Sequence, residues 1–274
     1  MRLREYIAHR VIGTPMERTA VALRNLGSLP WRLRHPELRR VFEESERIER
    51  MMDRVIAESV NCIDVGSHLG SVLNRMQRLA PGGRHIAVEP IPYKAAWLRS
   101  KFPRVEVLEL ALSDREGEED FCLIPHHSGY SGLRFHDVSG ESPTHMPVKC
   151  ARLDDVVPPD RDVGFIKIDV EGGELGALRG AVRLLGRCRP VVLFECTQSG
   201  LKAYQITAQD MHEFFAGEGY AVWLVEDWLD QRQPLSVDGF ATAMRYPFQA
   251  FNFLAVPETA AARRTEPASR TVAR

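Results

Sequence analysis

Long hydrophobic runs are missing from this sequence. No apolar stretch reaches the roughly 18 residues that a membrane-spanning helix needs, and the N-terminus, MRLREYIAHR, lacks the apolar core of a secretory signal. An excess of one charge is missing too, because 36 Lys and Arg residues nearly balance 37 Asp and Glu residues. Such a balance creates no overall field that would attract nucleic acid. We therefore expect a cytoplasmic protein without a transmembrane segment and without a nucleic-acid partner.

Cysteine is scarce and has no pattern. The five cysteines form neither a CxxC pair nor a Cys/His metal spacing, and an odd number without a framework is typical of a reducing compartment. The sequence also lacks GxGxxG, the loop that places the pyrophosphate of a dinucleotide against a helix N-terminus. These absences argue against a disulfide scaffold, a dedicated zinc site and a NAD-dependent dehydrogenase.

Short β-rich runs alternate with helical patterns from residue 59 onwards. This alternation predicts an α/β domain over 59–257, with a mostly parallel sheet and helices on both faces. The expected strands span 60–66, 85–90, 105–112, 163–172, 190–196, 220–226 and 251–257, and the expected helices span 70–79, 93–101, 174–185 and 208–217.

Three segments do not fit the alternation. Residues 1–58 are arginine-rich and strand-poor, and helical spacing of apolar residues predicts a helix over about 36–58. Residues 118–155 form a polar insertion, which we expect over the active site because long loops in compact domains are usually functional or disordered. Residues 258–274 are polar and predict a disordered tail. For the N-terminal helical segment, a cap on the domain, a homodimer contact and a weak peripheral contact with a membrane or an anionic substrate are all open.

Acidic residues follow most of the expected strands, where an open α/β sheet binds its ligands. The first loop reads DVGSHLG, and Asp64 would repel a pyrophosphate but attract a cationic ligand. Glu89 ends the second strand, where a carboxylate can accept both hydroxyls of a ribose. Asp114, in ALSDREG, lies where an acid can meet an adenine amino group. S-adenosylmethionine combines an adenosine, a positive tail and no phosphate, so these loops favour it over NAD.

The motifs IDVGSHLG, IAVEPIP, ALSDREG, SGYSGL, ARLDDVV, IKIDVEGGE and RPVVLFE occur in an order that resembles the FkbM-type family of S-adenosylmethionine-dependent methyltransferases. The most specific of them is IKIDVEGGE, residues 166–174. The resemblance implies a class I methyltransferase (Rossmann-like) fold with seven strands, the last one antiparallel. It also implies O-methylation of a hydroxyl on a sugar or secondary metabolite. The residues that we expect to bind the cofactor are Asp64, Gly66, Ser67, His68, Gly70, Glu89, Pro90, Ser113, Asp114 and Asp169.

Catalysis is harder to assign, because general-base help typically gives about 10²–10⁴-fold and alignment of the reactants contributes more. Asp169 follows a central strand and can contact the acceptor, the methionine end of the cofactor or a metal. We expect Asp169, Glu195 and His127 to be catalytic; His126, His136 and His145 of the insertion are further candidate bases. Lys167 is expected to pair with a neighbouring acid. A divalent metal held by Asp169, Glu195 and a histidine is an alternative that no dedicated motif supports.

The sequence thus predicts an S-adenosylmethionine-dependent O-methyltransferase whose partner is a small-molecule or glycan hydroxyl. Methylation of nitrogen or of a protein is an alternative within the same cofactor class. A binding module that keeps the cofactor pocket without catalysis is an alternative from another class, and it would bind the cofactor without transferring its methyl group.

Overall fold

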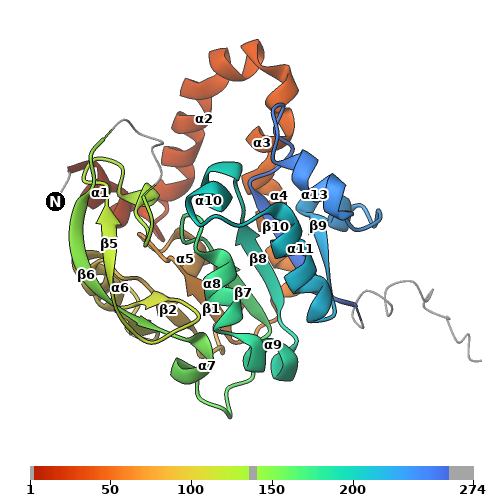
Figure 1. Cartoon of the computed structure of the whole chain (residues 1–274). Coiled ribbons are helices and arrows are strands. Elements are labelled where there is room, and N and C mark those ends of the chain that lie inside the picture. Colours follow the sequence, from red (N-terminus) through yellow and green to blue (C-terminus); the bar gives the residue numbers. More distant parts are fainter. Residues whose placement is uncertain (1–2, 136–140, 259–274) are drawn as a thin grey trace, which may run out of the picture.

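A computed structural model describes residues 3–135 and 141–258; the expected tail from residue 259 onwards and His136 lie outside these ranges. Within them, the largest sheet has seven strands in the order β3-β2-β1-β7-β8-β10-β9 (Figure 1). Only β10 runs antiparallel to its neighbours in this sheet. The predicted fold class is therefore confirmed, including the antiparallel last strand. The strands are β1 (Cys62–Val65), β2 (Ile86–Val88), β3 (Glu106–Leu108), β7 (Phe165–Ile168), β8 (Val191–Glu195), β9 (Tyr220–Leu224) and β10 (Asn252–Pro257).

Helices cover both faces of this sheet, because alternate residues of each buried strand point to opposite sides. Ile63 and Ile166 lie in one core cluster, and Cys62 and Phe165 lie in the other. The first cluster is covered by α8 (Glu174–Arg179), α9 (Val182–Cys188), α11 (Ala208–Gly217) and α13 (Val237–Ala243). The second is covered by α4 (Glu44–Val55), α5 (Ser71–Leu79), α6 (Pro92–Lys101) and α12 (Val225–Leu229).

The strand expected over 105–112 divides between two sheets. Its first part is β3, whereas β4 (Ala111–Leu112) pairs with β6 (Thr144–Ala151) in a second sheet of order β4-β6-β5. β5 (Gly117–Leu123) and β6 form an antiparallel hairpin, so the ends of the insertion are strands. The hairpin lies beside the main sheet (Figure 1). A 3-10 turn, η2 (Ser128–Tyr130), follows β5, and α7 (Leu153–Val156) follows β6.

Two further expected elements end early. The helix expected over 174–185 breaks at Gly180, where a side chain would collide with the carbonyl oxygen of Ser113. The strand expected over 220–226 ends at Leu224, because Val225 begins helix α12. A short helix, α10 (Gln198–Ala203), follows β8 and was not expected from the sequence.

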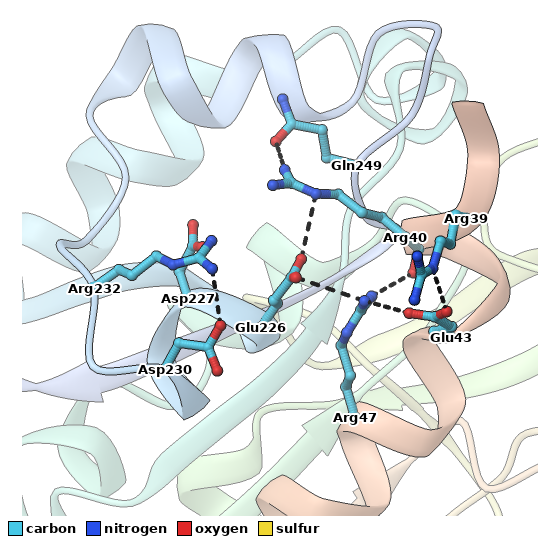
Figure 2. Close-up of polar contacts among 9 residues, drawn as sticks. All are labelled: Arg39, Arg40, Glu43, Arg47, Glu226, Asp227, Asp230, Arg232 and Gln249. Carbon is cyan, nitrogen blue, oxygen red and sulfur yellow. Dashed lines mark hydrogen bonds and ion pairs between the residues drawn. The ribbon is translucent and has the colours of Figure 1, made fainter. Parts of the chain in front are cut away.

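The second half of the N-terminal segment is built into the domain. The helix expected over 36–58 is divided into η1 (Pro36–Leu38), α3 (Arg39–Phe42) and α4. Met51 and Met52 of α4 are buried in the core. Figure 2 shows the polar contacts at its start: Arg40 lies 3.3 Å and Arg47 3.6 Å from the carboxylate of Glu226 in α12. Hydrophobic burial thus attaches α4 to the core, and the ion pairs attach its start to α12.

The first half consists of α1 (Leu3–Val11) and α2 (Met16–Arg34). Helix α1 lies against α6, where the ring of His9 stacks on Trp97 at a centroid distance of 5.0 Å. Helix α2 rises away from the domain and forms the arch at the top of Figure 1. Among the described helices, none combines the length and the hydropathy needed to cross a bilayer.

Candidate functional site

The loop after β1 turns back sharply over the sheet. Gly66, with φ +72°, and Ser67 both donate backbone hydrogen bonds to the carbonyl of Val88, at 3.0 and 3.1 Å. A side chain at position 66 would collide with the carbonyl oxygen of Asp169. At Gly70, φ +84°, an added Cβ would lie 2.5 Å from the ring of Phe102. Both glycines are therefore required by the packing of the loop itself.

Glu89 lies at the end of β2 with only 3% of its surface exposed. Its Oε2 accepts a hydrogen bond from the N–H of His68 at 2.9 Å, and its Oε1 accepts one from the N–H of Ile91 at 3.0 Å. Burial raises the pKa of this carboxyl, although Lys94 and the two N–H groups counteract the shift. Each oxygen keeps a free lone pair, so Glu89 is held rigidly and can still accept two hydroxyl donors.

A cavity of about 510 Å³ opens at the carboxyl ends of the central strands. The loops after β1, β2, β7 and β8 line it, together with Ile48 of α4 and the insertion segment Ser128–Leu133. The cavity brings together seven of the site residues expected from the sequence: Gly66, Ser67, His68, Glu89, Pro90, Asp169 and Glu195.

The remaining expected residues lie elsewhere. Asp64 is fully buried beneath the glycine loop, and Gly70 packs against Phe102. Ser113 and Asp114 line a neighbouring cavity of about 330 Å³. His127 lies outside the lining: its side chain is 54% exposed, and its Nδ1 lies 2.9 Å from Glu141. The chain turns after this histidine, so that the residues following it face the cavity.

Lys167 lies between two acids, as expected from the sequence. In the sheet it is the register partner of Asp64, so both side chains point to the same face. Its Nζ lies 3.7 Å from Asp64 Oδ1 and 3.2 Å from Asp169 Oδ2, and it donates to the carbonyl of Gly66 at 3.1 Å. Burial alone would lower the pKa of Lys167, but Asp169 and Asp64 outweigh it and raise the pKa. The cation that meets Asp64 is therefore Lys167, and Asp169 is the acid that faces the cavity.

Three carboxylates converge in the cavity. Oxygens of Asp169, Glu171 and Glu195 all lie within 4.8 Å of one another. Burial raises the pKa of Glu195 well above its usual value, and the negative charges of Asp169 and Glu171 add to the shift. The cluster therefore provides a carboxyl group that binds a proton tightly, next to Asp169, which is ion-paired.

The conformation of the loop after β7 explains why the motif IKIDVEGGE contains these glycines and acids. Glu171 and Gly172 have φ values of +58° and +99°, and an added Cβ on Gly172 would lie 2.7 Å from Gly200 Cα. Glu174 Oε1 accepts hydrogen bonds from the N–H groups of Val170 and Gly172, at 2.9 and 3.2 Å. The third acid of the motif, Glu174, thus holds the loop that presents Asp169 to the cavity.

Glu174→Gln is expected to change how stability depends on pH. Burial raises the pKa of Glu174 from 4.5 to about 7, so the folded state prefers the protonated carboxyl, and its stabilising contribution is lost as the pH rises from about 4.5 through 7. The glutamine should therefore gain stability relative to the native protein over this range, by up to about 3 kcal/mol. Urea unfolding at pH 5 and pH 8 measures the gain. Glu118→Gln, at an exposed position in β5, is the control, and an equal effect of Glu174→Gln at both pH values would contradict the assignment.

His68, in the loop after β1, and Lys94 both contact Ser128 of the insertion. Burial, with Lys94 and Lys167 nearby, lowers the pKa of His68 to about 3, and its Nε2 lies 3.3 Å from the hydroxyl of Ser128. Lys94 Nζ donates to the carbonyl of Ser128 at 3.2 Å, and burial lowers the pKa of this lysine to about 8. His68 is thus neutral, and it contacts the insertion without capping helix α5.

Sequence reasoning missed two residues of the cavity. Lys94 is buried beneath it, and the only sequence signal was a lysine among apolar residues at the start of an expected helix. Tyr204 lines both cavities, and its hydroxyl is buried without a hydrogen-bond partner among the described residues. The surrounding sequence, GLKAYQI, gives no sign of this position.

The sheet order, the antiparallel β10 and the cavity above the loops after β1 and β2 define a class I methyltransferase domain of the Rossmann-like type. The Methyltransferase FkbM domain matches residues 64–222, more than half of the chain. The chain therefore belongs to the FkbM family of methyltransferases.

Several known proteins are similar to parts of this chain. The AMB antimetabolite synthetase AmbE of Pseudomonas aeruginosa is 36% identical over 84 residues, which cover 29% of this chain and 4% of that protein. The FkbM methyltransferase of Methylobacillus flagellatus is 16% identical with a TM-score of 0.46, over 73% of this chain and 44% of that one. The precorrin-6y C5,15-methyltransferase of Geobacter metallireducens is 18% identical with a TM-score of 0.39, over 65% and 72% of the two chains.

Proposed function

We propose that this methyltransferase uses S-adenosylmethionine to methylate a hydroxyl group of a sugar or secondary metabolite. The observation that carries the proposal is Glu89: a rigid, buried carboxylate with two free lone pairs at the edge of the cavity. Such a group suits the two hydroxyls of a ribose. The backbone of the loop after β1 lies beside it, and the neutral His68 of that loop adds no positive charge for a pyrophosphate.

The residues that line the cavity fit this cofactor. Glu89 would hold the ribose, and Asp169, whose side chain is 35% exposed, would face the positively charged methionine end. Asp64 supports this arrangement from below through Lys167. When bound, S-adenosylmethionine supplies an activated methyl group on a sulfonium.

The acceptor proton has a candidate destination on this chain. Glu195 has a raised pKa, because it is buried beside Asp169 and Glu171, so its carboxylate is a stronger base than an exposed one. A general base works best when its pKa lies near the operating pH. We assign Glu195 as the base that receives the hydroxyl proton, and the buried hydroxyl of Tyr204 as a group that orients the acceptor.

Titration calorimetry with S-adenosylhomocysteine and with NADH tests the cofactor assignment. We expect S-adenosylhomocysteine to bind and NADH not to bind. Glu89→Gln should weaken the binding by at least about tenfold, because it removes a charged acceptor of hydrogen bonds. Glu118→Gln is the matched control at an exposed position. Binding of NADH alone, or unchanged affinity in Glu89→Gln, would contradict the proposal.

Radiolabelled S-adenosylmethionine, offered with panels of sugars, phenols, amines and peptides, tests the acceptor class. Transfer to hydroxyls supports O-methylation, and transfer to amines or peptides supports N- or protein methylation instead. Tight cofactor binding without transfer to any panel would favour a binding module. The cytoplasmic location expected from the sequence stays a prediction.

A further inference from the structure

Helix α2 carries an apolar stripe that the described chain leaves uncovered. Leu23, Leu26, Leu29 and Leu33 follow one another at intervals of three, three and four residues, which places them on one side of the helix. They are 64%, 64%, 47% and 73% exposed. Trp31, near the C-terminal end of α2, is half exposed although its ring contacts His35 and Phe42. Helix α2 rises away from the domain (Figure 1), and the exposed fractions of these leucines show that the described residues do not cover the stripe.

The charges of α2 indicate what covers the stripe. Its 19 residues include four arginines and one acid, Glu17. The carboxylate of Glu17 is turned towards its own chain, where Oε2 accepts from the N–H of Gly13 at 2.9 Å and from Asn74 at 3.4 Å. Arg34 is exposed, and Arg32 is partly buried, with its guanidinium 5.3 Å from the ring centroid of Phe42. An apolar stripe on a helix with four arginines, whose one acid is bonded to its own chain, complements a surface that is apolar inside and anionic outside.

A second copy of the chain is a poorer fit for the same stripe. Two α2 helices packed stripe to stripe would bring together two helices that each carry four arginines and one acid, and that acid, Glu17, is already bonded to its own chain. Like charges across an interface cost affinity. An anionic bilayer has no such conflict, and a helix with four arginines in 19 residues lies on a bilayer without crossing it.

We propose that α2 is a membrane-surface anchor that inserts its leucine stripe into the headgroup region of an anionic bilayer. This inference is independent of the proposed methyl transfer. It also sets an orientation, because α1, which precedes α2, contacts the rim of the cavity: Glu5 of α1 is hydrogen-bonded to Ser128 and, at 3.2 Å, to Tyr93. The bound membrane would then lie on the side of the sheet where the cavity opens.

Sedimentation of the full chain with sucrose-loaded vesicles tests the anchor. We expect the protein to pellet with phosphatidylcholine vesicles that contain about one third phosphatidylglycerol, and at least about tenfold less with pure phosphatidylcholine. Added salt should weaken the binding, since it screens the arginines. The double variant Leu26→Gln, Leu33→Gln should lower the partition coefficient at least about tenfold, and so should Arg32→Gln, Arg34→Gln.

Two control variants separate the anchor from general surface effects. Val182→Gln replaces an exposed apolar residue in α9, and Arg78→Gln, Arg104→Gln removes two exposed arginines outside α2. Both should bind vesicles like the native protein. The proposal is wrong if anionic vesicles bind no better than neutral ones, or if the controls lose binding as much as the α2 variants. A dimer in light scattering that the leucine variant abolishes, without vesicle binding, would also overturn it, because a second copy would then cover the stripe.

Discussion

Asp169→Asn is expected to abolish methyl transfer while the protein stays folded. Lys167 pairs with two acids, and Asp169 is the one that faces the cavity. Its Oδ2 lies 3.2 Å from Lys167 Nζ. Asparagine keeps the shape but removes the negative charge that would face the sulfonium end of the cofactor. Removing one preorganised electrostatic contact typically costs about 10²–10³-fold in rate. The fold should persist, because Lys167 keeps Asp64 and the carbonyl of Gly66 as partners.

The measurement is the rate of labelled methyl transfer to the acceptor that the panels identify, together with thermal unfolding and the affinity for S-adenosylmethionine. Asp160→Asn, at an exposed position before β7, is the matched control. We expect the control to transfer normally. If Asp169→Asn retains full activity, Asp169 has no part in the reaction, and Glu171 becomes the acid to test next.

The sequence was sufficient to predict the sheet, because strands buried on both faces are nearly continuous apolar runs and their alternation with helices permits few topologies. It failed where a contact between distant segments decides local structure. Gly180 ends a helix because the carbonyl of Ser113 lies against it, 67 residues earlier in the chain. The strand expected over 105–112 divides because its second part pairs with β6, a strand of the insertion.

The site shows the same division. Strand ends located Glu89, Asp169 and Glu195 correctly at the cavity, because parallel strands end at one edge of a sheet. The burial of Asp64 could not be predicted in this way, since only the register of β1 with β7 reveals that Lys167 lies opposite it. His127 was selected from its place beside SGYSGL, but the direction of a loop side chain depends on the turn that follows, which composition does not specify.

Lys167→Met is expected to destabilise the protein by about 3–5 kcal/mol, the typical cost of removing one partner of a buried ion pair. Asp64 would lose the ammonium group 3.7 Å away while remaining fully buried. Methionine retains much of the apolar volume of the lysine stem, so most of the loss should come from the uncompensated charge. Equilibrium unfolding in urea measures the loss of stability. Lys94→Met, which replaces a second buried lysine that is not adjacent to Asp64, is the comparison variant.

The double variant Lys167→Met, Asp64→Asn distinguishes charge from packing. If the unpaired carboxylate causes the loss, removing it should restore a large part of the stability, and the two substitutions will be strongly non-additive. Burial already raises the pKa of Asp64, and loss of Lys167 should raise it further. A raised pKa means that the folded state prefers the protonated acid, so the single variant should recover stability relative to the native protein as the pH falls, and lose it as the pH rises. A double variant as unstable as the single one at every pH would instead assign the loss to packing. In that case, Lys167 would stabilise the protein by packing in the core and not by compensating the charge of Asp64.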